Sequence, residues 1–171
     1  MNPIIKNIQS RKGFTLIELL VVISIIGILA ALSTASYTSA QKQARDTTRK
    51  SDLAQYRTAL ESYANKNNGL YPSYPSRISP NDATFCAYIM ESGTTCPGDP
   101  KSTDENYYYS YISDGTGGAA AATKYVLWAK LETVTNNWAV CSDGRSGKTA
   151  TWPVDSTCPP FVQTGPVPGL E

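Results

Sequence analysis

One acidic side chain, Glu18, lies near the start of an otherwise apolar run from Phe14 to Leu32. A charged side chain at the centre of a bilayer costs about 2.5 to 3.5 kcal/mol on insertion scales, and less toward the edge. A buried charge is tolerated chiefly when it is paired. We therefore predict that Glu18 has a cationic partner. An unpaired carboxylate that reaches the membrane interface is the alternative.

Sulfur chemistry is the second candidate. The chain has four cysteines, and in an oxidising compartment an even number indicates disulfides. Pairing Cys86 with Cys96 and Cys141 with Cys158 is the simplest of three connectivities. Structural zinc is the competing interpretation, but the chain has no histidine and no close Cys-x2-4-Cys spacing. We therefore expect disulfides and no metal at these cysteines.

Phosphate chemistry is suggested only by Gly147-Lys148-Thr149, which resembles the end of a P-loop. Ser142 stands where that motif needs its first glycine, and Pro153 interrupts the helix that should follow. We therefore expect no nucleotide site. Because histidine is absent and the cysteines are assigned to disulfides, no catalytic constellation remains, and the chain is predicted not to be an enzyme.

The apolar run itself is long enough to cross a membrane. Its nineteen residues form a helix of roughly 28 Å, close to the roughly 30 Å hydrocarbon core of a bilayer. The leader at 1–13 carries Lys6, Arg11 and Lys12 and no acid, which favours a cytoplasmic leader and an outward domain. The sequence thus predicts one anchor and one extracytoplasmic domain.

The charge of the chain argues against a nucleic-acid partner. The formal net charge is +1, with 15 basic and 14 acidic residues. Without the three leader cations the balance is about −2 by the same count. We therefore expect no direct nucleic-acid site, because such sites need a basic patch.

The first forty residues admit three interpretations. A secretory signal would be cut near Ser33-Thr34-Ala35, and a plain signal-anchor would stay uncut. The third rests on residues 11–18, Arg-Lys-Gly-Phe-Thr-Leu-Ile-Glu, and the apolar run that follows. This segment resembles the class III signal of type IV pilins and of the pseudopilins of type II secretion and competence systems. The resemblance implies cleavage after Gly13 by a prepilin peptidase and methylation of the new N-terminal Phe14.

The same resemblance implies a function. Glu18 would pair with the Phe14 amine, in the family with that of a neighbouring subunit. The chain would be a structural subunit of a type IV pilus-like filament, held in the cytoplasmic membrane and then assembled outside it. Its partners would be further copies of itself, the prepilin peptidase, and an inner-membrane platform with its ATPase. A pseudopilin of a secretion or competence system is the alternative, and a membrane-tethered binding module that never polymerises is the alternative of another class.

Beyond the membrane a helix is expected to continue, with an apolar stripe at Leu53, Tyr56, Leu60 and Tyr63. The opposite positions are predicted to form a solvated face, with an Asp46–Lys50 pair; lipid headgroups and acids of the next subunit are the alternative partners for the cations. These positions are Lys42, Arg45, Asp46, Arg49, Lys50 and Asp52. The turn residues at 67–69 predict the end of the helix.

The outer domain is predicted to be α+β. A short helix is expected over 80–92, with Ser79 as N-cap. Antiparallel strands are expected at 106–112, 124–132 and 136–141, with a fourth at 149–154, and 113–123 is expected to be a flexible loop. The sheet would cover the apolar stripe, and the resemblance implies the ladle-shaped type IV pilin architecture.

These predictions divide the chain into five segments. They are a cleaved leader at 1–13, a transmembrane assembly helix at 14–35, an amphipathic helix at 36–68, a globular domain at 69–158 and an extended tail at 159–171. No cofactor is expected. Calcium is the minor alternative, because acids lie in the loops, although without EF-hand spacing. These acids are Asp99, Asp104, Glu105, Asp114 and Asp143.

Overall fold

The computed structural model describes residues 13–90, 93–117 and 119–162, except for the side chains of 33–35. The predicted leader, apart from Gly13, and the predicted tail beyond Val162 lie outside the described residues. The chain divides into two compact units, Met1–Ala40 and Gln41–Glu171. We describe each by itself.

The first unit contains the N-terminal part of helix α1 (Leu16–Lys66). A window of this helix has a mean hydropathy of 2.7, and its side chains are exposed. Among the described residues, α1 is the one helix that is long and apolar enough to cross a membrane. This property of length and composition agrees with the predicted anchor.

The second unit contains the C-terminal part of α1, which ends at Lys66, two residues before the predicted end. Asn68 adopts a left-handed φ of 56°, and the Gly69 amide donates to the Ala64 carbonyl over 2.8 Å. This is the Schellman arrangement, which satisfies a carbonyl of the last turn. The Asn-Asn-Gly sequence ends the helix for that reason.

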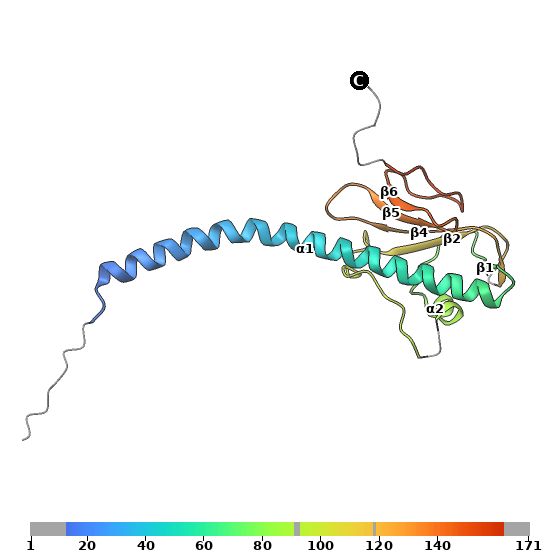
Figure 1. The fold of residues 1–171 in the computed structure, drawn as a ribbon, viewed down its shortest axis with the longest axis horizontal. Coiled ribbons are helices and arrows are strands. Elements are labelled where there is room, and N and C mark those ends of the chain that lie inside the picture. The colour runs from blue at the N-terminus through green and yellow to red at the C-terminus, as the bar shows by residue number, and fades with distance from the viewer. Residues whose placement is uncertain (1–12, 91–92, 118, 163–171) are drawn as a thin grey trace, which may run out of the picture. The chain divides into compact units, whose positions relative to one another are not determined.

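A four-stranded antiparallel sheet faces this part of α1 (Figure 1). Its strands are β2 (Tyr109–Ser113), β4 (Tyr125–Lys130), β5 (Asn137–Cys141) and β6 (Ser146–Thr149), in the order β2-β4-β5-β6. A separate two-stranded sheet pairs β1 (Tyr71–Pro72) with β3 (Ala120–Ala122). The α+β class is confirmed. The small sheet was not predicted, and β3 lies in the segment predicted to be a flexible loop.

Two strand boundaries differ from the prediction. Strand β2 begins at Tyr109 because Asp104 organises a turn before it, accepting hydrogen bonds from the Asn106 backbone and side-chain amides. Strand β6 begins at Ser146, immediately after the turn at Gly144, rather than at Thr149. Gly147-Lys148-Thr149 therefore belongs to a strand and forms no loop around a phosphate.

The main core lies between α1 and the inner face of the sheet. Leu53, Tyr56 and Leu60 are fully buried there, and Tyr63 is half-buried, so the predicted apolar stripe is confirmed. The sheet contributes alternate residues, as expected when one face of a strand is directed at a helix. These are Tyr109, Tyr111, Tyr125, Leu127, Ala129 and Val140.

The outer face of the sheet is covered as well. Trp128 and the other outward residues of the strands form a second cluster, against which Cys158 and Phe161 pack. Val162 donates its amide to the Lys148 carbonyl of β6 over 2.7 Å. Residues 159–162 are therefore part of the packed unit, and the prediction that the extended tail begins at 159 is wrong.

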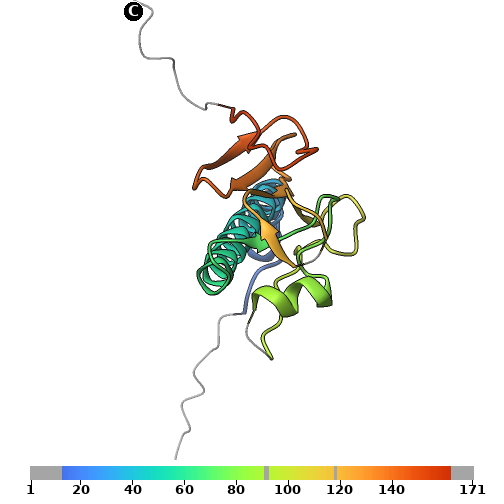
Figure 2. The ribbon, with the colours of Figure 1, turned by 90° about the vertical axis from the view of Figure 1, so that its right-hand side faces the viewer.

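Helix α2 (Ala83–Ile89) is shorter than the predicted helix over 80–92. Its N-cap is Asp82, whose Oδ1 accepts from the Thr84 and Phe85 amides over 2.9 and 3.3 Å. The predicted N-cap, Ser79, instead starts a turn in which its carbonyl accepts from the Asp82 amide. The helix begins later because the aspartate satisfies two free amides of the first turn. Figure 2 shows α2 and the strands on different sides of α1.

Candidate functional site

The predicted processing site lies directly before α1. Gly13, Phe14 and Thr15 are outside the helix, and the Phe14 side chain is 89% exposed. A Cβ atom added at Gly13 would meet no atom within 4 Å. The backbone between Gly13 and Phe14 is therefore accessible to a peptidase. Cleavage itself stays a prediction, since nothing in the structure reports it.

Glu18 has hydrogen-bond partners inside its own helix. Its Oε2 accepts from the Thr15 amide over 2.8 Å and from the Thr15 hydroxyl over 2.6 Å. The Thr15 Oγ1 in turn accepts from the Glu18 amide over 3.3 Å. This reciprocal pattern is a capping box, for which Thr-x-x-Glu is the sequence signal. We did not predict this capping box, because only a charge partner was considered for Glu18.

The capping box fixes where the carboxylate lies. Glu18 is held at the first turn of α1, where the helix dipole favours a negative charge. Its oxygens are therefore directed back toward Thr15 and the chain that precedes it. The predicted partner, the Phe14 amine, comes into being only with cleavage, so the charge pair stays a prediction.

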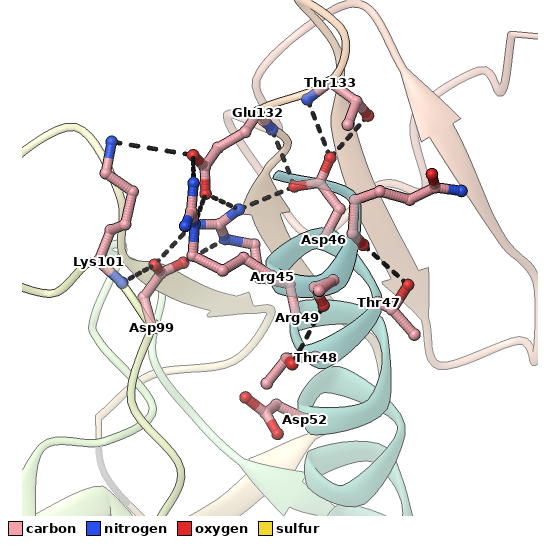
Figure 3. A network of polar contacts seen from close by, with 12 residues as sticks. Arg45, Asp46, Thr47, Thr48, Arg49, Asp52, Asp99, Lys101, Glu132 and Thr133 are labelled. Atoms are coloured by element: carbon pink, nitrogen blue, oxygen red, sulfur yellow. Dashed lines mark hydrogen bonds and ion pairs between the residues drawn. The ribbon is translucent and has the colours of Figure 1, made fainter. Parts of the chain in front are cut away.

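The predicted solvated face of α1 contains buried charges (Figure 3). The Arg49 side chain is fully buried, and its Nε and Nη2 donate to the two carboxylate oxygens of Asp99 over 2.7 and 2.9 Å. Its Nη1 donates to Asp46 over 2.8 Å and lies 2.8 Å from Glu132. For Asp46, Arg49 and Asp52 the prediction of a solvated face is wrong, since all three are buried.

Asp46 has a second role at the loop after β4. Its oxygens accept from the Glu132 and Thr133 amides over 2.8 and 3.0 Å and from the Thr133 hydroxyl over 2.7 Å. Burial raises the pKa of Asp46, but these hydrogen bonds outweigh it and lower the pKa overall. The carboxylate thus stays ionised and holds the loop on the helix.

Glu132 forms ion pairs with two arginines of α1. Arg45 donates to both of its oxygens over 2.7 Å, and Arg49 approaches from the other side. The hydrogen bonds from Arg45 are the largest cause that lowers the pKa of Glu132 to about 2. Lys101 lies 3.9 Å from the same carboxylate. The cluster therefore joins α1 to two loops, and the ion pairs of Arg49 within it are shielded from water.

The one pair predicted on this part of α1, Asp46–Lys50, is absent from the described residues. Lys50 places its ammonium group 4.7 Å from the centre of the Trp138 ring, rather than on Asp46. The predicted Asp46–Lys50 pair is wrong because Arg49 and the loop amides already occupy the carboxylate. Asp52 accepts a 2.5 Å hydrogen bond from the Tyr109 hydroxyl, and burial raises its pKa.

The four cysteines form two local disulfides, Cys86–Cys96 and Cys141–Cys158. This is the connectivity considered simplest from the sequence. The first closes the loop after α2, and the second ties residue 158 to the end of β5. Each crosslink restricts the unfolded chain and so stabilises the folded one.

Three of the five acids considered for calcium have partners within the chain. Asp99 pairs with Arg49, Asp114 accepts from the Thr123 and Lys124 amides, and Asp143 pairs with Arg145. In the described part of the chain, the one cluster of three potential metal ligands is Cys141, Asp143 and Cys158, and both of its cysteines are oxidised. The disulfide therefore removes both thiolates from this cluster, and calcium at the loop acids stays the minor alternative prediction.

Known proteins match both units of the chain. The family described as the prokaryotic N-terminal methylation motif matches residues 8–34. The type II secretion system core protein G of Pseudomonas aeruginosa is 43% identical over an alignment of 122 residues that covers 64% of this chain and 79% of that protein. The type IV wide pilus major component PilA4 of Thermus thermophilus is 35% identical, over 52% of this chain and 72% of the relative.

A fimbrial protein of Pseudomonas aeruginosa is 34% identical over half of this chain and 56% of its own length. Three observations thus coincide. They are the methylation motif, an exposed apolar helix whose first turn holds Glu18 in a capping box, and a small antiparallel sheet packed on the same helix. The chain belongs to the family of type IV pilins and type II secretion pseudopilins.

Proposed function

We propose that the chain is a structural subunit of a type IV pilus-like filament. The observation that carries this proposal is the apolar N-terminal part of α1, whose described side chains are exposed and which follows Gly13-Phe14 within the methylation motif. Such a surface is stable in lipid before assembly and against other copies of the same helix afterwards. The role is structural rather than enzymatic.

The proposed assembly step uses Glu18. A prepilin peptidase cuts after Gly13, and the new Phe14 amine carries a positive charge in an apolar environment. Lipid tails are as apolar as the helix, so apolar contact alone gives little preference for one axial offset over another. The pairing of Glu18 with the amine of a neighbouring copy would fix that offset. The Thr15 cap supports this role, because it holds the carboxylate at the N-terminal end.

A second candidate is a pseudopilin of a type II secretion system. The observation that favours it is the 43% identity to core protein G of Pseudomonas aeruginosa, which extends over 79% of that protein. The two candidates share processing and assembly and differ in where the fibre acts. Deletion of the gene would abolish secretion of exoproteins in the pseudopilin case and would remove sheared surface fibres in the pilus case.

N-terminal sequencing combined with intact mass tests the proposal most directly. In cells that contain the prepilin peptidase, we expect Phe14 as the first residue, with one added methyl group. A chain that begins at Met1 or at Ser36 would contradict the proposal. A tethered module that never polymerises would also be cleaved or anchored, so sheared cells must additionally yield fibres that contain this chain. In that module, Glu18→Leu would behave as the wild type.

A further inference from the structure

A shallow groove with an uncharged described lining lies between α1 and the chain after α2 in the second unit. It has a volume of about 600 Å³ and is lined by small residues of α1 and by the chain that follows α2. Ala54, Thr58 and Ala59 contribute from the helix, and Met90, Thr95 and Pro97 form the opposite wall. None of its described lining residues carries a charge. A partner can therefore cover the groove without removing a charge from water.

Three interactions hold the chain segment that forms the wall of the groove opposite α1. Cys96 is bonded to Cys86 of α2, and the Tyr56 hydroxyl donates to the Pro97 carbonyl over 2.6 Å. Two residues further on, Asp99 is held by the buried Arg49. A wall held this firmly loses little freedom when it is covered, which favours binding. The buried charge cluster thus positions a surface that is itself uncharged.

The same unit carries an apolar projection after β6. Val154 is 85% exposed and Trp152 is 41% exposed, two of the four large apolar side chains exposed in the described part of this unit. The Trp152 ring stacks on Tyr108 at a centroid distance of 6.3 Å, and Pro153 between the two exposed residues is buried. The projection is therefore held in place. Tryptophan is enriched among the residues that dominate protein interfaces.

The groove and the projection lie on different sides of the unit. In Figures 1 and 2, α2 lies on one side of α1, and the orange-to-red segment after β6 lies on the far side of the sheet. The projection of one chain thus cannot fill its own groove. Two different patches that meet between copies make a head-to-tail contact, which forms open helical polymers when the rotation does not close a ring.

We propose that the projection at Trp152 and Val154 of one copy binds in the groove at Ala54, Thr58 and Met90 of the next copy. The contact rests on the proposed function, because it joins the globular units of an assembled filament. The groove is open to solvent and its described lining is uncharged, so an exposed indole and a neighbouring valine can lie in it without removing a charge from water. The contact adds a specific lateral connection to the packing of the N-terminal helices.

Chemical crosslinking of assembled fibres tests this contact. Thr58→Cys and Val154→Cys place one thiol in the groove and one on the projection, and both positions are exposed. The four native cysteines are oxidised and do not react with maleimides. Fibres of the full-length double variant, treated with a short bismaleimide, should give a ladder of dimers, trimers and higher species on a denaturing gel.

Single variants give the controls for this experiment. Thr58→Cys alone and Val154→Cys alone should stay monomeric, and a co-assembled mixture of the two should stop at dimers. A Thr103→Cys/Val154→Cys variant, with Thr103 exposed outside the groove, should give no ladder. Fibres of the Thr58→Cys/Val154→Cys variant that stay monomeric would overturn the contact and leave the filament proposal intact. Wild-type chains that form no fibres would contradict both.

Charge substitutions give a test that needs no crosslinker. Thr58→Lys and Val154→Asp each place a charge in the contact, and we expect each to lower the yield of sheared fibres about tenfold. The double variant should recover most of that yield, because the two charges then face each other. Thr103→Lys should leave the yield unchanged. Single variants that assemble like the wild type would overturn the contact.

Discussion

Arg49 and Asp99 lie fifty positions apart in the chain, yet their side chains form two parallel hydrogen bonds of 2.7 and 2.9 Å in a site closed to solvent. The bidentate geometry is that of a strong ion pair. It connects α1 directly to the loop that follows the first disulfide. The pair matters to stability because removal of Arg49 would leave the Asp99 charge buried without its counter-ion.

Arg49→Ala should destabilise the second unit by about 3 to 5 kcal/mol, because it leaves the buried carboxylates of Asp46 and Asp99 without their cation, while Glu132 keeps Arg45. Urea unfolding of the full chain in detergent, followed by tryptophan fluorescence, measures the change. Arg145→Ala is the matched control. Its partner is Asp143 in an exposed pair, and the expected loss is at most about 1 kcal/mol. Equal losses in the two variants would contradict the account.

The decrease in the free energy of unfolding at acid pH should depend on Glu132. The fold lowers the pKa of Glu132 from its ordinary 4.5 to about 2, so the folded state holds the charged form more strongly than the unfolded chain does. The contribution is fully present above about pH 4.5 and is lost as the pH falls from there toward 2. In Glu132→Gln, unfolding curves between pH 5 and 2, roughly the window set by these two values, should therefore be flatter. A Glu132→Gln curve as steep as the wild type would contradict this.

Asp52 should change the pH dependence of stability in the opposite direction. Because burial raises its pKa, the folded state takes up the proton more readily than the unfolded chain, and protonation stabilises the fold as the pH falls. Asp52→Asn removes the buried charge and keeps an acceptor for the Tyr109 hydroxyl. We expect the variant to be at least as stable as the wild type at pH 7. A loss above about 1 kcal/mol there would refute this assignment.

The start of α2 can be tested with two small substitutions. Asp82→Ala removes the N-cap and should cost about 1 kcal/mol. Ser79→Ala should cost less, because its hydroxyl caps no helix in this structure. Thermal unfolding of both variants under identical conditions compares them. A larger loss of stability in Ser79→Ala than in Asp82→Ala would support the helix start at Pro80 that was predicted from the sequence.

Fibre formation should separate the two roles of Glu18. Glu18→Gln keeps an oxygen that accepts from Thr15 but carries no charge, so we expect normal cleavage and a loss of sheared fibres. Thr15→Val removes the hydroxyl partner and keeps the charge, and it should assemble. If Glu18→Gln assembled like the wild type while Thr15→Val failed, the carboxylate would serve only as a cap.

The sequence predicts the part of the fold that depends on periodic apolar residues. Leu53, Tyr56 and Leu60 recur at helical spacing, and the structure buries all three against the sheet. The same spacing continues backward to Arg49 and Asp46, which are buried too. We predicted that those positions face water, because a charged side chain is rarely buried without partners. The partners of these side chains lie in distant loops, so the local sequence does not reveal them.

Other features depend on contacts that no local pattern reports. Strand β3 is a run of alanines that becomes a strand only by pairing with Tyr71 and Pro72. The cover on the outer face of the sheet depends on Phe161, which lies so close to Gly147 that an added Cβ would stand 2.9 Å from its ring. In contrast, the Thr15–Glu18 cap has a local signal that could have been found.

The cover over the outer face has a consequence for the order of events during biosynthesis. Strand β4 is buried on both sides, but one of those sides is closed only by residues near 158–162, synthesised some thirty residues later. A nascent chain still held by the ribosome or the translocation channel therefore exposes Trp128. In the proposed topology, completion of the domain awaits passage of its last segment across the membrane, and the Cys141–Cys158 disulfide then secures that segment.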